Sequence, residues 1–204
     1  MTNSRGALSL ATAALLLVAG TSCANDDTDP TDPRSEPTAS SPPASSSSPL
    51  SPSDASSSAA TKTIRNYYVV RNELRQDPTQ PLSRLKTVAI STELTTQQTL
   101  FKRERQQGLH QTGETKVVKV QVESVNLDNS DPKAGKVPTV QIDVCFDVSD
   151  VDVLDKDGKS VVSPDRPDTG WIRYAVANYQ WESDPDGAWR VASSQDIERT
   201  PCDA

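Results

Sequence analysis

The chain has 204 residues, of which 34% are hydrophobic and 4% are aromatic, and its formal net charge is −7. Such an acidic chain lacks the basic face that nucleic acids require, and so few apolar residues exclude a protein with several membrane spans. It has one histidine and no Cys-x-x-Cys pair. The sequence therefore predicts no metal site and no cofactor.

Residues 1–23 have the organisation of an export signal. Arg5 gives a positive start, and the apolar run 7–20 is about 14 residues long, which is too short to span a bilayer but fits a signal peptide. Small residues then precede Cys23. This arrangement resembles the lipobox of bacterial lipoproteins, which implies that Cys23 is lipidated and anchors the protein at the outer face of the cell membrane. Cleavage of an ordinary secretory signal, which would remove Cys23 and release the protein, is the alternative.

Residues 24–60 differ from the rest of the chain in composition. Ser, Pro and Thr account for 22 of these 37 residues, and Leu50 is the only strongly apolar side chain. A segment with so little apolar surface cannot offset the entropy that it would lose on ordering. We therefore expect a disordered tether that holds the following domain away from the membrane.

The segment 61–204 begins with helical periodicity. An amphipathic helix over about 60–76 is predicted from the spacing of its apolar residues, Ile64, Tyr67, Tyr68 and Leu74. Pro81 can open a short second helix. A third helix is predicted to begin at Ser91 or Thr92 and to end at Gly108. Its expected inner face is marked by Leu94 and Phe101.

The later part of the segment alternates between apolar and polar residues. Strands are expected around Val118–Val122, over Val140–Val148, and at about 170–182 and 188–198. Two turn signals separate them, Asp157-Gly158 and Asp186-Gly187. Helices followed by antiparallel strands with one covered face indicate an α+β fold, in which N-terminal helices pack on a sheet of about four strands.

This arrangement resembles the NTF2-like fold, and several motifs are similar to those of uncharacterised lipoproteins of high-GC Gram-positive bacteria (actinobacteria) and their phages. The motifs are Gln107–Gly113, Cys145–Ser149, Asp157–Lys159 and Gly187–Val191. The resemblance implies a curved sheet and, because NTF2-like sheets often pair, a homodimer. Domains of this fold include small enzymes, ligand binders and interaction modules, so it implies no single activity.

Two cysteines remain once Cys23 is lipidated or removed. In an oxidising compartment, Cys145 and Cys202 are expected to form a disulfide that pins the C-terminal end of the chain to the second strand. Free thiols, or Cys145 as a nucleophile paired with His110, are the alternative.

Two acidic residues and three aromatic residues are candidates for a pocket. Asp143 and Asp147 share one strand face, where they would act as general bases if that face lined a cavity, or as solubilising charges if it met solvent. Tyr174, Tyr179 and Trp181 lie near the end of the chain, where they would pack in the core or wall a binding pocket.

These observations favour a lipid-anchored accessory or binding protein outside the cytoplasm, with no catalytic residues assigned. Its expected partners are the membrane, an envelope protein or a small apolar ligand. Two alternatives stay open: a small hydrolase or isomerase that uses an Asp with a raised pKa, and an envelope protein that excludes phages.

Overall fold

The computed structural model describes residues 50–200 and Cys202. The chain divides into two units, and the described residues belong to the second, Ser47–Ala204. The predicted signal peptide, its Cys23 and most of the predicted tether lie outside the described residues. Within these residues, no helix is both long and apolar enough to cross a membrane.

Helix α1 (Pro52–Gln76) packs along the sheet. Ser51 caps its N-terminus, because the Ser51 hydroxyl accepts a hydrogen bond of 3.2 Å from the backbone N–H of Asp54. Pro52 occupies the first helical turn, where its missing N–H costs nothing. The helix ends just before Asp77-Pro78, as the sequence predicts.

The predicted boundary between tether and domain is wrong at its C-terminal end. Residues 52–60, assigned to the tether from their composition, form the first turns of α1. Ser56 is 3% exposed and Ala60 is fully buried. Together with Ile64 they recur at four-residue steps, so they continue the inner face of the helix with side chains small enough for close approach to the sheet. Composition alone hides this, because Ser is polar and the methyl group of Ala adds little apolar surface.

The next two helices agree with the sequence in position. A 3₁₀ helix, η1 (Leu82–Thr87), follows Pro81, and α2 (Ser91–Gln106) ends just before Gly108, whose φ of +72° favours glycine. The inner face of α2 is more polar than predicted: its buried side chains are Glu93, Gln97 and Phe101, whereas Leu94 is partly buried.

Four strands form an antiparallel sheet in the order β2-β3-β5-β6. Their bounds are β2 Lys116–Asn126, β3 Thr139–Asp147, β5 Thr169–Asn178 and β6 Trp189–Ile197. A second, small sheet pairs β1 (His110–Thr112) with β4 (Asp152–Leu154). The 3₁₀ helix η2 (Pro132–Ala134) lies between β2 and β3. The α+β class, with helices before a four-stranded sheet, is confirmed.

Strand β2 does not keep the simple alternation that the sequence predicts. Its pairing with β3 shifts register twice, after Val117 and after Val122. Val118, which lies within the first shift, is 37% exposed, and Val122 is 41% exposed although its register partner, Ile142, belongs to the core. The residues of β2 that pack against the core are instead Val117, Val120 and Val125. Each bulge turns the following side chains to the other face, which a strict period of two cannot reveal.

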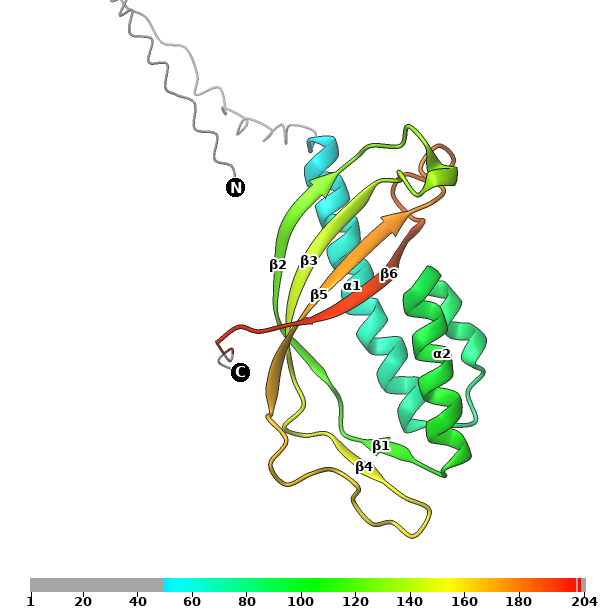
Figure 1. The fold of residues 1–204 in the computed structure, drawn as a ribbon, viewed down its shortest axis with the longest axis vertical. Helices are drawn as coiled ribbons and strands as arrows, with labels where there is room; N and C mark the ends of the chain where they lie inside the picture. Colours follow the sequence, from blue (N-terminus) through cyan, green and yellow to red (C-terminus); the bar gives the residue numbers. More distant parts are fainter. Residues whose placement is uncertain (1–49, 201, 203–204) are drawn as a thin grey trace, which may run out of the picture. The chain divides into compact units, whose positions relative to one another are not determined.

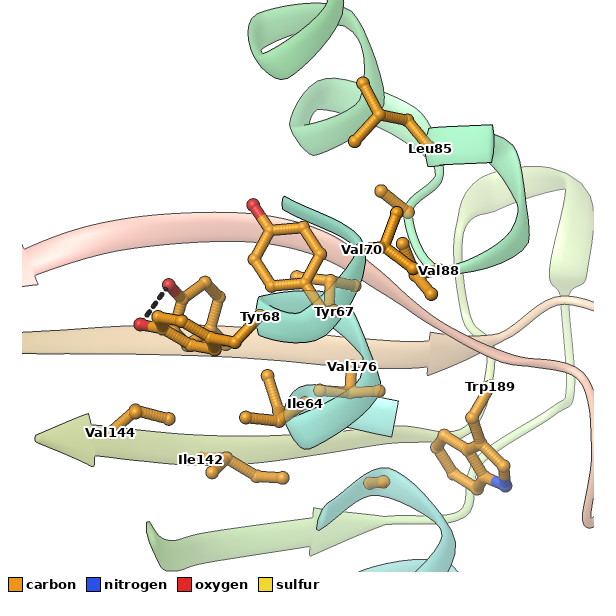
Figure 2. Packing of buried hydrophobic residues seen from close by; sticks show 14 of the residues in the cluster. Ile64, Tyr67, Tyr68, Val70, Leu85, Val88, Ile142, Val144, Val176 and Trp189 are labelled. Carbon is orange, nitrogen blue, oxygen red and sulfur yellow. Dashed lines mark hydrogen bonds between the residues drawn. The ribbon is translucent and has the colours of Figure 1, made fainter. Parts of the chain in front are cut away.

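The hydrophobic core fills the space between the helices and one face of the sheet, which we call the inner face. Ile64 and Tyr67 of α1 pack there with Ile142, Val144 and Val176 of the sheet (Figure 2). In Figure 1, α1 lies behind the sheet, and the described residues that follow β6 cross in front of it. The sheet therefore separates the core from residues 198–200.

The outer face of the sheet is covered by the C-terminal strap, which we define as residues 198–200 and Cys202. Cys202 forms a disulfide with Cys145 of β3, with Cα atoms 6.2 Å apart. The indole N–H of Trp171 donates to the carbonyl of Thr200 at 3.0 Å, and the Arg199 guanidinium lies 5.0 Å from the centre of the Trp171 ring. The predicted disulfide is thus confirmed. It attaches Cys202 to β3, the second long strand, as expected.

Candidate functional site

Three tyrosines meet in the middle of the core. Tyr67 and Tyr68 come from α1 and Tyr174 from β5, and their ring centres are 5.8 to 6.2 Å apart in edge-to-face geometry. The hydroxyls of Tyr68 and Tyr174 are 2.8 Å apart and share a hydrogen bond (Figure 2, dashed line). We call these three residues the tyrosine centre. Burying a hydroxyl without a hydrogen bond costs free energy. The hydrogen-bond partners and charges around the three hydroxyls therefore determine their protonation state and reactivity.

Glu93 of α2 is 2% exposed and accepts three hydrogen bonds. The Tyr67 hydroxyl and the Gln97 amide donate to one of its oxygens, the latter at 2.9 Å, and the Ser194 hydroxyl of β6 donates to the other at 2.6 Å. Glu93 therefore connects both helices with the sheet, and its acceptor capacity is largely used by these neutral donors.

Arg71 lies one turn beyond the two α1 tyrosines. The carbon at the centre of its guanidinium is 5.2 Å from the Tyr67 ring centre and 5.6 Å from the Tyr68 ring centre. Its Nε–H is buried and has no hydrogen-bond partner. Among the described residues, no carboxylate or carbonyl pairs with this guanidinium. A cation held only by aromatic rings is an unusual feature of a core.

The tyrosine hydroxyls stay protonated around this cation. Burial raises the pKa of Tyr174 and of Tyr67 well above 10, against the opposing effect of the Arg71 charge. Burial likewise raises the pKa of Tyr68. The tyrosine centre thus presents neutral hydroxyls and rings to the fixed positive charge of Arg71, and its phenols supply no base near neutral pH.

Asp143 lies elsewhere, on the outer face of the sheet. Its side chain is fully buried and is held by Arg173, with contacts of 2.6 and 2.8 Å, and by Arg199 of the C-terminal strap at 2.8 Å. Glu123 of β2 joins the same group, 3.3 Å from Arg199. We call these four residues the outer ion cluster.

The state of Asp143 contradicts both roles that the sequence offers for it. The hydrogen bonds from Arg173 lower the pKa of Asp143 despite its burial. A general base of the proposed isomerase type needs a raised pKa, and a solubilising charge needs exposure. Asp143 has neither property, because the C-terminal strap covers it. It is a buried anchor for two arginines.

Asp147 ends strand β3. Its carboxylate accepts a 2.7 Å hydrogen bond from the backbone N–H of Ser149, which lowers the pKa of Asp147. The residue is 7% exposed. This hydrogen bond stabilises the turn after the strand. It gives Asp147 a structural role that requires no binding pocket.

The predicted aromatic residues separate in the structure. Tyr174 belongs to the tyrosine centre, but β5 ends at Asn178, so Tyr179 and Trp181 lie in the connection to β6. Tyr179 is 44% exposed, and Trp181 packs edge-to-face on Trp189 with ring centres 6.0 Å apart. The five predicted pocket residues therefore do not line one cavity.

Two open grooves border this connection. One, of about 650 Å³, runs between the first half of α1 and the connection, with Ala59, Thr63 and Trp189 in its wall. The other, of about 270 Å³, includes Tyr179, Ile90 and Leu94. Within residues 50–200 and Cys202, no cluster of three or more His, Cys, Asp or Glu side chains is arranged to hold a metal ion. His110 begins β1 and is only partly exposed.

Sequence reasoning missed Arg71 and Glu93, although their spacing carries a signal. Arg71 follows Tyr67 by four residues, which places it on the apolar face of α1 rather than among the solvated charges. Glu93 precedes Phe101 by eight residues, which places it on the inner face of α2. A charged residue at a position of the apolar face is the observation that could have identified both.

Comparison with known proteins does not identify a family. No family model matches the chain, and no curated protein matches it. Among solved structures, the intermembrane-space region of the chloroplast protein ARC6 aligns with 15% identity over 69% of this chain and 95% of that chain, with a TM-score of 0.46. A de novo designed β-sheet protein aligns with 15% identity over 72% of this chain and 88% of that chain, with a TM-score of 0.28.

Proposed function

We propose that the chain is a lipid-anchored binding protein of the outer face of the cell membrane, with an NTF2-like domain that is not catalytic. Cys23 is the site of the anchor. At the cell surface, the domain binds a small ligand or an envelope protein. The homodimer that the resemblance implies is compatible with this role.

The observation that carries the proposal is the disulfide between Cys145 and Cys202. Structural disulfides persist in exported proteins, whereas the thiols of cytosolic proteins are kept reduced. The pairing therefore supports export, as does the signal-like composition of residues 1–23. The NTF2-like architecture is supported by the coarser finding that helices cover one face of a four-stranded antiparallel sheet.

Binding is favoured over catalysis by the charge states of the buried groups. Arg173 lowers the pKa of Asp143, and burial raises the pKa of Tyr67 and Tyr174. Neither the acid nor the phenols are tuned for proton transfer near neutral pH. The buried Nε–H of Arg71, by contrast, has no hydrogen-bond partner, which favours a binding role.

The location is tested by fractionating a Gram-positive host that expresses the full chain. We expect the wild-type protein in the membrane fraction, accessible to protease added to intact cells. Cys23→Ala should appear in the medium, because it has no thiol to acylate. Cys202→Ser is the matched control, since it removes a different cysteine and should stay on the membrane. Wild-type protein in the medium would replace the anchor with simple secretion, and wild-type protein in the cytoplasm would contradict export.

A further inference from the structure

The surface around Tyr179 is an open groove with apolar walls. We call the groove of about 270 Å³ that includes Ile90, Leu94 and Tyr179 the Tyr179 groove. It lies where the end of η1, the start of α2, the connection between β5 and β6 and the start of β6 meet. Tyr179 is exposed, and Ile90 and Leu94 are only partly buried. Apolar side chains from different segments therefore reach solvent at one place.

Backbone hydrogen bonds hold the walls of the Tyr179 groove in place. The Ile90 N–H donates to the Val191 carbonyl, and the Val191 N–H donates to the Val88 carbonyl, each at 2.9 Å. This short pairing runs along the edge strand β6. The Leu94 N–H in turn donates to the Ile90 carbonyl at 3.3 Å. The apolar walls are thus formed before a partner arrives, which lowers the entropy that binding would cost.

The charged side chains that line the Tyr179 groove, among the described residues, are both cations, Lys86 and Arg190. Lys86 is exposed, and Arg190 donates to two backbone carbonyls. Within residues 50–200, neither forms an ion pair. Four other arginines do pair with carboxylates: Arg75, Arg84, Arg173 and Arg199. In a chain of net charge −7, the groove therefore presents positive charge that is free to attract an anionic partner.

The size and shape of this surface favour a protein segment over a small ligand. Pockets for small molecules usually measure about 300–1,000 Å³ and enclose most of the ligand. The Tyr179 groove is smaller and open, but Arg190 also lines the groove of about 650 Å³ that includes Lys62 and Trp189. The two grooves thus adjoin at Arg190. An extended chain can follow both, whereas a compact ligand would cover only one.

The positive charge is greatest at the Tyr179 groove. The larger groove includes Lys62 and Arg190 but also Asp186, so its charges partly cancel. A partner that carries several carboxylates is therefore best placed with these groups beside Lys86 and Arg190. An apolar side chain next to the carboxylates would then reach the walls of the Tyr179 groove.

We infer that the adjoining grooves bind an extended acidic segment of a partner protein. An apolar side chain of the segment packs on Ile90, Leu94 and Tyr179, and its carboxylates contact Lys86 and Arg190. This inference rests on the proposed binding function and names the kind of partner. Tyrosine and arginine often dominate the energy of an interface, while complementary charges set orientation and association rate.

The inference is tested by NMR titration of the exported, disulfide-bonded full chain carrying Cys23→Ser. The probe is the acetylated and amidated peptide Gly-Glu-Asp-Phe-Glu-Asp-Gly. One control peptide has Lys in place of each acid, and another has Ser in place of Phe. We expect saturable shifts of the backbone N–H signals of Ile90, Tyr179 and Ala188 with the acidic Phe peptide, and affinities lower by about fivefold or more with both controls. No saturable shift, shifts confined to another surface, or equal affinity for the Lys peptide would overturn the inference.

Two further measurements test other occupants of the same surface. Phenylacetate carries a ring and one carboxylate without a peptide chain, and we expect it to bind about tenfold more weakly than the acidic peptide or worse. Equal affinity would make the groove a small-molecule site and would overturn the inference. In sedimentation equilibrium, wild type and Tyr179→Ser should have the same oligomeric state. A dimer that Tyr179→Ser converts to a monomer would show that a second copy fills the groove.

Charge variants assign the recognition of the carboxylates. Lys86→Glu should lower affinity for the acidic peptide by about three- to tenfold, as expected for reversing an exposed charge. Lys102→Glu makes the same charge change on the exposed side of α2, away from both grooves, and should bind as the wild type does. An equal loss in both variants would show that only net charge matters and would overturn the inference.

Apolar variants assign the contact with the Phe side chain. Tyr179→Ser should lower affinity for the acidic peptide by about tenfold or more, since it removes the central apolar contact. Val161→Ser removes another exposed apolar side chain, in the connection between β4 and β5, and should have no effect. Wild-type affinity in Tyr179→Ser would overturn the inference. The spread of the N–H signals in each spectrum shows that the variant is folded.

The inference and the proposed location fail separately. A chain that fractionates with the membrane but does not bind the acidic peptide contradicts this inference alone. A cytoplasmic chain that binds the peptide at the Tyr179 groove contradicts only the proposed location.

Discussion

At the scale of single residues, charges in this domain behave according to their partners rather than their depth. Asp143 is fully buried yet remains an anion, because two arginines reach it. Removing one member of such a group leaves a buried charge without a partner. The stability lost in this way exceeds the net stability that the ion pair contributes. Arg71 is the opposite case, a cation whose partners are rings.

Asp143→Asn is expected to lower the free energy of unfolding by about 1–3 kcal/mol at pH 7, as the loss of charged hydrogen bonds predicts. The pKa of Asp143 in the folded protein is below its ordinary 3.8. The stability that its charge contributes is therefore present above that value and is lost as the pH falls through the lower folded pKa. The difference between wild type and variant in urea unfolding should accordingly shrink below about pH 4.

Asp150→Asn is the control for this measurement. Asp150 pairs with Lys116, but its side chain is 60% exposed. Its replacement should change stability by no more than about 0.5 kcal/mol. If Asp150→Asn lowered the free energy of unfolding as much as Asp143→Asn does, the outer ion cluster would stabilise the fold no more than an exposed ion pair does.

At the scale of elements, α1 shows how spacing can outweigh composition. Its first turns consist mainly of Ser and Ala, yet a side-chain cap, a proline in the first turn and an acidic residue there favour a helix. Packing on the sheet then supplies the stability that the intrinsic helix propensity of these residues does not provide. The result is a domain that begins before the residue at which its composition changes.

Ser56→Glu tests this extended boundary. Ser56 is 3% exposed, so a glutamate there would either bury a charge or push α1 from the sheet, and we expect a loss of about 2–3 kcal/mol in the free energy of unfolding. Ser58→Glu lies two residues away on the exposed side of the same helix. It should change stability by less than about 0.5 kcal/mol. If both substitutions changed the free energy of unfolding equally and only slightly, residues 52–60 would belong to the tether and not to the folded domain.

At the scale of the whole domain, the C-terminal strap joins parts of the chain that are distant in sequence. The disulfide closes a separation of 57 residues. Arg199 reaches Asp143 of β3 and Gln121 of β2, the latter at 2.8 Å. The strap therefore links the edge strand β6 with the opposite edge of the sheet across its outer face, and the disulfide limits how far it can separate.

Reduction of the disulfide, or Cys202→Ser, should lower the free energy of unfolding by about 2–4 kcal/mol, since a loop of this length loses its constraint. The indole protons provide a local readout. Trp171 donates to Thr200 in the strap, whereas Trp189 donates to Pro185 at 2.8 Å, away from it. Hydrogen exchange followed by NMR should accelerate at Trp171 on reduction and stay unchanged at Trp189. Unchanged exchange at both would show that the strap holds without its disulfide.

The sequence by itself determined the features that depend on local pattern. The period of the apolar residues predicted the two longer helices and then antiparallel strands. Pro81 predicted the short helix between them, and Gly108 and Asp77-Pro78 predicted where two helices end. The pairing of Cys145 with Cys202 followed from counting cysteines in an exported chain. These predictions succeed because helix and strand periods, turn conformations and the number of available thiols do not depend on distant packing.

Only the tertiary structure decided which side chains meet. The first bulge of β2 took Val118 out of the series of inward-facing residues, because register depends on the neighbouring strand. The outer face of the sheet became buried because the strap returns across it, which turned Asp143 from a candidate base into an ion-pair anchor. The tyrosine centre joins residues of α1 and β5 that are 106 positions apart. Burial and charge pairing set the chemistry of a side chain, and both arise from segments that the sequence order keeps apart.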